Sequence, residues 1–293
     1  MSDKAKGIIF IILGAVFFGF MNTCFKLVGD LPTMQKVFFR NFFAFILSFI
    51  LLVRKGEQIR SKNFKFVLLR SILGYLGIVT NVYAVSKLML ADANILLNTN
   101  PFFIIVFSVL CLKEPLKRYH IPTLLLALLG AVLVIKPQFN YTIIPSLIGL
   151  SAGMFAGSAY TTVRYLSKYD NPQIIVVYFS GISVLITIPF LIFGPYIPPT
   201  PLQWLILLGV GIFGTIAQFF ITYAYRYAPA SELSIYNYAQ ILVTLLLGMI
   251  IWHEIPDVLS ISGGALIVLA GYINYAYSKR EEYGEKYKSE VME

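Results

Sequence analysis

The stretch IIFIILGAVFFGFMNTCFKLV (Ile8–Val28) decides the class of fold, because it is a long apolar run in which Lys26 is the only charged residue. A helix needs roughly 20 such residues to cross the hydrocarbon core of a membrane. A strand of a transmembrane barrel would be shorter and would alternate apolar with polar residues, and this stretch does neither. It is therefore predicted to be a membrane-spanning helix.

Nine further apolar runs follow, so most of the 293-residue chain is predicted to lie in membrane-spanning helices. The composition agrees, with 58% hydrophobic and only 13% charged residues, because soluble domains carry about 25% charged residues. The loops between the runs leave no room for a soluble domain. We expect an all-α integral membrane protein with ten transmembrane helices, at Ile8–Val28, Met34–Val53, Phe66–Lys87, Ala93–Leu112, Ile121–Ile135, Ile143–Leu166, Gln173–Phe193, Gln203–Tyr227, Leu233–Trp252 and Val258–Ser278.

Lysine and arginine are concentrated in alternate loops, which predicts the orientation in the membrane. With the N-terminus inside, the segments on the inner side hold 17 of the 23 basic residues and those on the outer side hold 4. Basic residues are retained on the cytoplasmic side, so both termini are expected in the cytoplasm. The net charge of +9 is thus interpreted as a sign of topology, and no nucleic-acid partner is expected.

The chain repeats itself when it is shifted by 140 residues. Each copy contains an aromatic-rich helix end, a turn with one acid, an apolar helix and a second acid. The matching positions are Tyr83-Ala84 with Tyr223-Ala224, Asp92 with Glu232, and Lys113-Glu114 with His253-Glu254, and a shift of 138 pairs Gly19 with Gly157 and Lys26 with Arg164. Residues 1–138 and 139–293 are therefore predicted to be two copies of one five-helix unit, the second with a short charged cytoplasmic tail.

An odd number of helices in each unit means that the two copies cross the membrane in opposite directions. The charges agree, because the loop at Glu114 is basic whereas the loop at Glu254 contains no lysine or arginine. Inverted repeats recur in secondary transporters, in which the two halves exchange conformations and open a central site to either side of the membrane. The predicted fold is thus a pair of inverted five-helix repeats.

Several short motifs carry a resemblance to a known family. They are Phe39-Arg40, Asn100-Pro101 and Leu110-Cys111-Leu112-Lys113-Glu114-Pro115-Leu116 in the first half, and Tyr238-Ala239-Gln240, Gly248 through Glu254, Gly263-Gly264 and Gly271 in the second. With these motifs the chain resembles the EamA branch of the drug/metabolite transporter superfamily over nearly its whole length. The resemblance implies export or uptake of small metabolites through a central cavity in a bacterial plasma membrane, with the last helix of each half at the periphery.

Polar side chains within the predicted spans are candidates for the wall of that cavity, because an uncompensated polar group in lipid should face the bundle interior. Some share one helical face, as Asn94 and Asn98 do at spacing i, i+4. Hydrogen bonds between helices would satisfy the same side chains without a substrate, and this remains the alternative for each of them. The predicted cavity residues are Asn22, Asn81, Tyr83, Asn94, Asn98, Tyr160, Gln218, Thr222, Tyr223, Ser234 and Tyr238.

A second group of residues is predicted to act in structure or gating. Arg40 lies inside the second span, where it would pair with an acid or a helix C-terminus, or attract an anionic group. Pro101 is expected to kink the fourth helix in the middle of the membrane. Glu114 and Glu254 match the family's acid at the end of the fourth helix of each half, and the resemblance implies that each ties this helix to the next one.

Three other charged residues have structural interpretations. Arg70, near the start of the third span, is expected to extend its long side chain to the nearest membrane interface. Asp92 and Glu232 are predicted to cap helix N-termini. No acid is predicted at mid-membrane, where a proton relay would be most expected. A proton therefore stays only one candidate for an unknown coupling ion.

Together these features predict a secondary transporter for a small organic metabolite, such as an amino acid, with export as one direction. A flippase of the same fold, acting on a lipid or a lipid-linked sugar, is the alternative. An enzyme is not expected, because His120 and His253 are predicted at opposite membrane faces and no metal, phosphate or cofactor motif accompanies them. The expected partners are the substrate and membrane lipid, the expected state is a monomer or a homodimer, and neither cofactor nor metal is expected.

Overall fold

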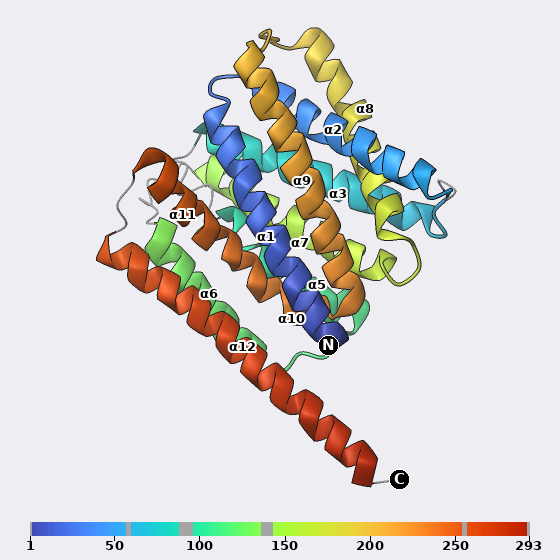
Figure 1. Cartoon of the computed structure of the whole chain (residues 1–293), viewed down its shortest axis with the longest axis vertical. Coiled ribbons are helices and arrows are strands. Elements are labelled where there is room, and N and C mark those ends of the chain that lie inside the picture. The colour runs from blue at the N-terminus through green and yellow to red at the C-terminus, as the bar shows by residue number, and fades with distance from the viewer. Residues whose placement is uncertain (1, 57–59, 88–95, 136–142, 254–256, 292–293) are drawn as a thin grey trace.

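The computed structural model describes residues 2–56, 60–87, 96–135, 143–253 and 257–291, and every regular element within these ranges is a helix (Figure 1). Within these described ranges, eight stretches are long and apolar enough to cross a membrane, and α5 and α6 are shorter apolar helices. The all-α membrane fold is thereby confirmed. The helices are α1 (Asp3–Leu27), α2 (Thr33–Arg54), α3 (Phe64–Lys87), α5 (Asn100–Leu112), α6 (His120–Ile135), α7 (Ile143–Leu166), α8 (Pro172–Phe193), α9 (Pro201–Tyr227), α10 (Ala230–Leu233), the 3-10 helix η1 (Ser234–Tyr238), α11 (Ala239–Trp252) and α12 (Val258–Val291).

Local signals in the sequence set several helix starts. The side chain of Asn171 accepts a hydrogen bond from the backbone N–H of Gln173, and Pro172 occupies the first position of α8, where its missing N–H costs nothing. Thr200 and Gln203 form a reciprocal capping box at the start of α9. These caps satisfy backbone groups that have no partner within the helix, and they place both helix starts within a few residues of the predicted span boundaries.

The fourth span of each half is interrupted, which corrects the continuous helices predicted there. Asn98 and Thr99 form a turn immediately before α5. In the second half, α10 is a single short turn of helix and passes into the 3-10 helix η1 before α11 begins at Ala239. The two interruptions end at equivalent points of the repeat. Interrupted spans at matching positions of two halves are a feature of transporter binding sites.

Pro101 lies in the first turn of α5, so the predicted kink within a continuous helix is wrong. A proline in the first turn removes no intrahelical hydrogen bond, whereas one in the helix interior would remove a bond and clash with the preceding turn. The chain therefore breaks at Asn98 and Thr99 and starts a new helix, and this places a helix start inside the bundle.

Helices of one half pack in antiparallel fashion on helices of the other half (Figure 1). The first helix of each half packs on the third of the other, as α1 on α9 and α7 on α3, and the second and fifth helices pair as α2 with α8 and α6 with α12. Gln203 at the start of α9 donates to the carbonyl of Val28 at the end of α1 (3.0 Å), and Ser61 before α3 donates to Asp170 after α7 (2.6 Å). Equivalent antiparallel pairs between the two halves are the arrangement that an inverted repeat produces, and the inverted repeat is thereby confirmed.

The backbone shows the register of the repeat directly. Both α5 and α11 end on a non-glycine residue in the left-handed conformation, Lys113 and His253, each with φ of 55°. The N–H groups of these two residues donate to the carbonyls of Ser108 and Gly248, which are again 140 residues apart. A positive φ is uncommon for residues other than glycine. Its occurrence at both positions therefore indicates that the two halves end this helix in the same way.

Glycines allow equivalent close contacts in the two halves. A Cβ added to Gly157 of α7 would lie 2.6 Å from the Cβ of Phe103 and 3.1 Å from the carbonyl oxygen of Asn100 in α5. A Cβ added to Gly19 of α1 would lie 2.6 Å from Val243 in α11, which is 140 residues after Phe103. The main buried core lies among these helices and α9. The pair α6 and α12 lies at the margin of the bundle, as the resemblance implies, and α12 extends beyond it (Figure 1).

Candidate functional site

A buried ion pair joins the two halves at one end of the bundle. Glu114, just after α5, accepts a hydrogen bond from Nε of Arg164 in α7 at 2.8 Å. The other carboxylate oxygen of Glu114 accepts from the backbone N–H groups of Ala230 and Ser231 at the start of α10, at 2.9 and 3.3 Å. The resemblance implied a tie from Glu114 to the helix that follows it. The bonds run instead across the repeat, to α7 and α10.

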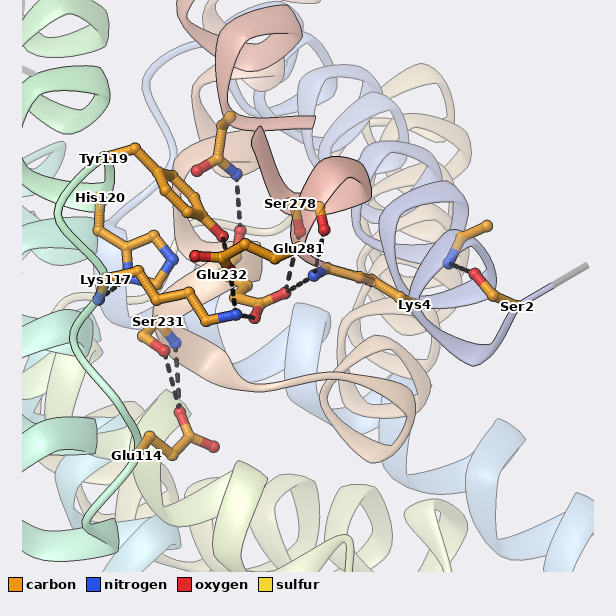
Figure 2. A network of polar contacts seen from close by, with 12 residues as sticks. Ser2, Lys4, Glu114, Lys117, Tyr119, His120, Ser231, Glu232, Ser278 and Glu281 are labelled. Carbon is orange, nitrogen blue, oxygen red and sulfur yellow. Dashed lines mark hydrogen bonds and ion pairs between the residues drawn. The ribbon is translucent and has the colours of Figure 1, made fainter. Parts of the chain in front are cut away.

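A second cluster lies beside the first, at the same end (Figure 2). Glu232 of α10 is 6% exposed, and its carboxylate lies 2.6 Å from the amine of Lys4 in α1 and 3.7 Å from that of Lys117 before α6. Ser278 of α12 donates to the same carboxylate at 3.3 Å, and Lys117 also pairs with Glu281 of α12. The cluster therefore holds α1, α10 and α12 and the start of α6 together.

Glu232 lies in the first turn of α10, as predicted for an acid at a helix N-terminus, but its carboxylate bonds to Lys4 and Ser278 and does not cap the helix. Pro229 is the N-cap of α10, and within the described structure no side chain in the N-cap position bonds to this helix. The acceptor at the start of α10 is Glu114, which comes from the other half of the chain. A carboxylate at a helix N-terminus satisfies unpaired N–H groups and complements the helix dipole. Asp92, the predicted counterpart of Glu232, and Glu254, the counterpart of Glu114, lie outside the described residues.

Tyr119 lies at the edge of the second cluster, next to α12. Its hydroxyl donates to Glu281 at 3.4 Å, and its ring stacks on Tyr277 with centroids 5.6 Å apart. Burial raises the pKa of the Tyr119 hydroxyl above its ordinary value. This side chain is thus a neutral hydrogen-bond donor at physiological pH, and the charges of the cluster come from its lysines and glutamates.

Arg70 lies in the interior of the bundle and is only 2% exposed, so the predicted extension to the membrane interface is wrong. Its guanidinium lies over the ring of Phe179 in α8, with Cζ 3.8 Å from the ring centroid. It also lies over Gly74, where an added Cβ would overlap with Nη1. Within the described structure, Nε and Nη1 of Arg70 have no hydrogen-bond partner. The side chain turns inward because Gly74 and Phe179 leave it a fitted space there.

Arg40 also points into the bundle, from α2 toward α1 and α9. Its Nε donates to the sulfur of Met21 at 3.3 Å and lies beside Gly214, and Nη1 is 3.5 Å from the side-chain oxygen of Asn41. A thioether is a weak acceptor, so neither contact neutralises the charge. Among the described residues, no acid forms an ion pair with Arg40 or Arg70.

Tyr160 of α7 lies in the same part of the bundle interior as the two arginines. Its hydroxyl lies within electrostatic range of both guanidinium groups, which are also within range of each other. Its ring lies 5.9 Å from that of Tyr225 in α9. The interior of the bundle thus holds three side chains from three different helices: Arg40 of α2, Arg70 of α3 and Tyr160 of α7.

Three of the predicted cavity residues are buried and hydrogen-bonded, two of them within their own segments and one to the other half of the chain. The Thr222 hydroxyl donates to the carbonyl of Gln218 at 2.7 Å, and that of Ser234 is 3.5 Å from the carbonyl of Ser231. Tyr238 donates from its hydroxyl to the carbonyl of Asn98 at 3.0 Å. Because Asn98 and Tyr238 are equivalent in the repeat, this contact lies where the two halves meet.

The remaining predicted cavity residues are dispersed. Asn22 is partly buried, and the side-chain oxygen of Asn81 is buried without a partner in the described structure. Tyr83 is 39% exposed. Tyr223 lines an apolar groove with Phe10 and other residues of α1 and α9. Asn94 lies outside the described residues. For the whole set, contact with a substrate stays a prediction.

Sequence reasoning did not find the partners of Lys4, Lys117 and Arg164, nor the burial of Arg70. The ion pairs join residues far apart in the chain, and the repeat gives no signal for them because they link different elements of the two halves. The sequence did contain one indication that the Arg70 side chain could turn inward. Gly74 lies one helical turn later on the same face of α3 and leaves space for it. Among the described residues, no group of three or more His, Cys, Asp or Glu side chains forms a potential metal site.

Comparisons with known proteins agree with this architecture. Two segments, residues 5–136 and 143–276, match the EamA-like transporter family. The pseudopaline exporter CntI of Pseudomonas aeruginosa is 33% identical, over 90% of this chain and 94% of its own length. A riboflavin transporter of Brucella anthropi is 27% identical over 87% and 90% of the two chains, and human solute carrier family 35 member G1 is 24% identical over 93% and 79%.

A solved crystal structure has the same fold, with a TM-score of 0.81 at 16% identity, covering 95% of this chain and 99% of the other. The matched segments correspond to the two halves of the inverted repeat. The relatives named above are transporters of small molecules or solute carriers. The chain therefore belongs to the EamA-like transporter family of the drug/metabolite transporter superfamily, and it is a multi-pass membrane transporter rather than an enzyme.

Proposed function

We propose that this chain is a secondary transporter that moves a small organic metabolite across the plasma membrane of a bacterium by alternating access, with export as its direction. The observation that carries the proposal is the inverted repeat with its fourth span interrupted at matching positions. Two halves with the same internal packing exchange conformations at little cost, and so open a shared centre to one side and then the other. Relatives named for pseudopaline export and riboflavin transport support a small organic cargo.

The test is metabolite profiling of a bacterial host that expresses the chain, compared with the same host carrying an empty vector. We expect at least one small organic metabolite to rise several-fold in the medium and to fall inside the cells. Riboflavin belongs in the panel because two relatives are named for it. A medium that matches the control would contradict the proposal. If the medium matches and lipids exposed on the outer leaflet change, the flippase alternative replaces it.

The two ion-pair clusters form the cytoplasmic gate in this proposal. They lie at the end where α1 begins, and the distribution of lysine and arginine assigns that end to the cytoplasm. They join both halves, so an opening toward the cytoplasm has to break them. In this proposal the contacts of Glu114 and Glu232 in the described conformation correspond to the closed state of the gate.

Glu232→Gln should make the cytoplasmic end open more readily, because an amide cannot balance the charges of Lys4 and Lys117. The measurement is the labelling rate of a cysteine placed at the buried Ser231, with a membrane-impermeant maleimide, in inside-out vesicles of a variant without Cys24 and Cys111. We expect the rate to rise several-fold over the parent.

The matched control for this labelling experiment is Asp3→Asn, which breaks an ion pair to Lys6 on the exposed surface of the same helix end. Exposed ion pairs contribute little, so this control should label at the parental rate. Equal rates for Glu232→Gln and Asp3→Asn would remove Glu232 from the gate.

The orientation has its own test, because the gate assignment depends on it. A green fluorescent protein fused after residue 293 folds in the bacterial cytoplasm, whereas alkaline phosphatase becomes active outside it. We expect the first fusion to fluoresce and the second to be inactive. The opposite result would place both clusters on the outer side and reverse the direction of the gate.

A further inference from the structure

We propose that Arg40 and Arg70 form an anion-binding site inside the bundle, and that the transported metabolite carries a carboxylate or phosphate group. This inference rests on the proposed transport function, for which it names the substrate class. A charged side chain in the membrane interior costs free energy, and such side chains are found mainly where they serve substrate or ion binding.

The burial of Arg70 is the first observation. The residue is 2% exposed, and its Nε and Nη1 have no hydrogen-bond partner within the described structure. A buried charge is tolerated when a counter-charge and hydrogen bonds compensate for lost hydration. Here the ring of Phe179 supplies a cation–π contact only. These two N–H-bearing nitrogens are therefore unpaired in the described conformation, and a negatively charged ligand would satisfy them once the site opens.

The position of Arg70 is built by its surroundings. Gly74, one helical turn after Arg70, leaves the space that the guanidinium occupies, and any larger residue at this position would overlap with Nη1. Phe179 covers the guanidinium on the side of α8. A planar guanidinium held in this way presents an edge that has no hydrogen-bond partner at Nε and Nη1 in the described structure, and that edge matches the geometry of carboxylate and phosphate oxygens.

Arg40 adds a second positive charge in the same region. Its described partners are the sulfur of Met21 and the side-chain oxygen of Asn41, and neither is charged. Two positive charges within electrostatic range destabilise each other unless an anion lies near both. Tyr160 contributes a neutral hydroxyl within range of both. Arg40 is partly exposed and Arg70 is enclosed, so access to Arg70 requires the conformational exchange of the two halves.

Arg164 shows how a purely structural arginine is accommodated in this protein. Its Nε pairs with Glu114 at 2.8 Å, and its Nη1 donates to the carbonyl of Tyr225 at 2.6 Å. Arg164 thus has both an anionic partner and a carbonyl acceptor. Within the described ranges Nε and Nη1 of Arg70 have no such partner, although Arg70 is more enclosed than Arg164, whose side chain is 13% exposed. The contrast separates an arginine that holds the fold from one that awaits a ligand.

The first arm of the experiment measures the melting temperature of the detergent-purified protein without ligand. Arg70→Met should melt at the wild-type temperature or higher, because it removes a buried charge that has no acid partner. Arg164→Met is the matched control and should melt several degrees lower, because it leaves Glu114 unpaired. A loss of stability in Arg70→Met as large as in Arg164→Met would mean that Arg70 is structural, and would overturn the proposal.

The second arm repeats the melts at low ionic strength with anionic probes and their neutral counterparts. The pairs are glutamate with glutamine, succinate with succinamide, and glycerol 3-phosphate with glycerol. A ligand that binds the folded state raises its melting temperature. We expect at least one anion to raise that of the wild type by about 2 °C or more, its neutral counterpart to have no effect, and the shift to be lost in Arg70→Met and in Arg40→Met but partly kept in Arg70→Lys.

Three results would overturn the anion site: no anion shifts the wild type, a neutral counterpart shifts it equally, or the anion shift persists in both methionine variants. The proposed transport function is tested separately by metabolite profiling. If the exported metabolites are neutral or cationic and Arg70→Met exports them normally, the anion site fails while transport stands. If anions bind as expected but nothing is exported, the anion site stands and the transport function fails.

Discussion

Glu114→Ala should lower the free energy of unfolding by about 3–5 kcal/mol, the range found when one partner of a buried ion pair is removed. The substitution leaves Arg164, whose side chain is only 13% exposed, without its carboxylate, and it removes the acceptor of the Ala230 and Ser231 N–H groups at the start of α10. Unfolding of the detergent-purified protein by denaturant, followed by tryptophan fluorescence, measures the change. We also expect transport to be lost, because this carboxylate joins the two halves.

The double variant Glu114→Ala with Arg164→Met is the internal control for this prediction. It removes the uncompensated charge, so it should recover part of the stability that the single variant loses. Asp3→Ala removes an exposed carboxylate and should leave the free energy of unfolding nearly unchanged. If Glu114→Ala is no less stable than Asp3→Ala, the buried pair does not hold the halves together.

Gly157→Ala is expected to lower the free energy of unfolding by about 1–3 kcal/mol, as overpacking of a tight contact does. The new Cβ would lie 2.6 Å from the Cβ of Phe103 and 3.1 Å from the carbonyl oxygen of Asn100. These atoms belong to the start of α5, next to the interrupted part of the fourth span, so α7 and α5 would have to separate. Thermal unfolding in detergent is the measurement.

The repeat supplies a second copy of this experiment. Gly19→Ala makes the equivalent contact with Val243 in α11, and should destabilise the protein by a similar amount. Gly209→Ala in α9 is the matched control, because its new Cβ would be in ordinary contact with Cys24 at 3.4 Å, and alanine is the better helix former. A loss of stability at Gly209 equal to that at Gly157 would show that helical glycines are sensitive for another reason.

Much of the fold could be predicted from the sequence because the signals are local. The solvent of a membrane span is lipid, so each span must be apolar over its own length and must satisfy its own backbone. The register of the repeat was equally readable, and the left-handed caps at Lys113 and His253 lie at the positions that the 140-residue shift aligned. The interruption before α5 was harder to predict from the sequence, because Pro101 is compatible with a kink as well as with a new helix start.

The interior contacts could be predicted only in part. Polar residues were expected to face inward, and Tyr238 does reach Asn98, its equivalent in the other half. Arg70 was expected to reach the interface, since a long cationic side chain near a helix end has that option. In the structure the Arg70 side chain lies in the bundle interior instead, because Gly74 of its own helix and Phe179 of α8 form a space for it. Such a space depends on which helices become neighbours.

The sequence by itself thus determined the all-helical membrane class, the positions of the spans and the two-fold repetition of the chain. Only the tertiary structure decided that Glu114 bonds to Arg164 and to the start of α10, that Glu232 pairs with Lys4 and Lys117, and that Arg70 is enclosed. The physical reason is the range of the interactions. Hydropathy and helix periodicity act between neighbours in the chain, whereas a buried charge is compensated by whichever group the packing of distant helices brings within reach.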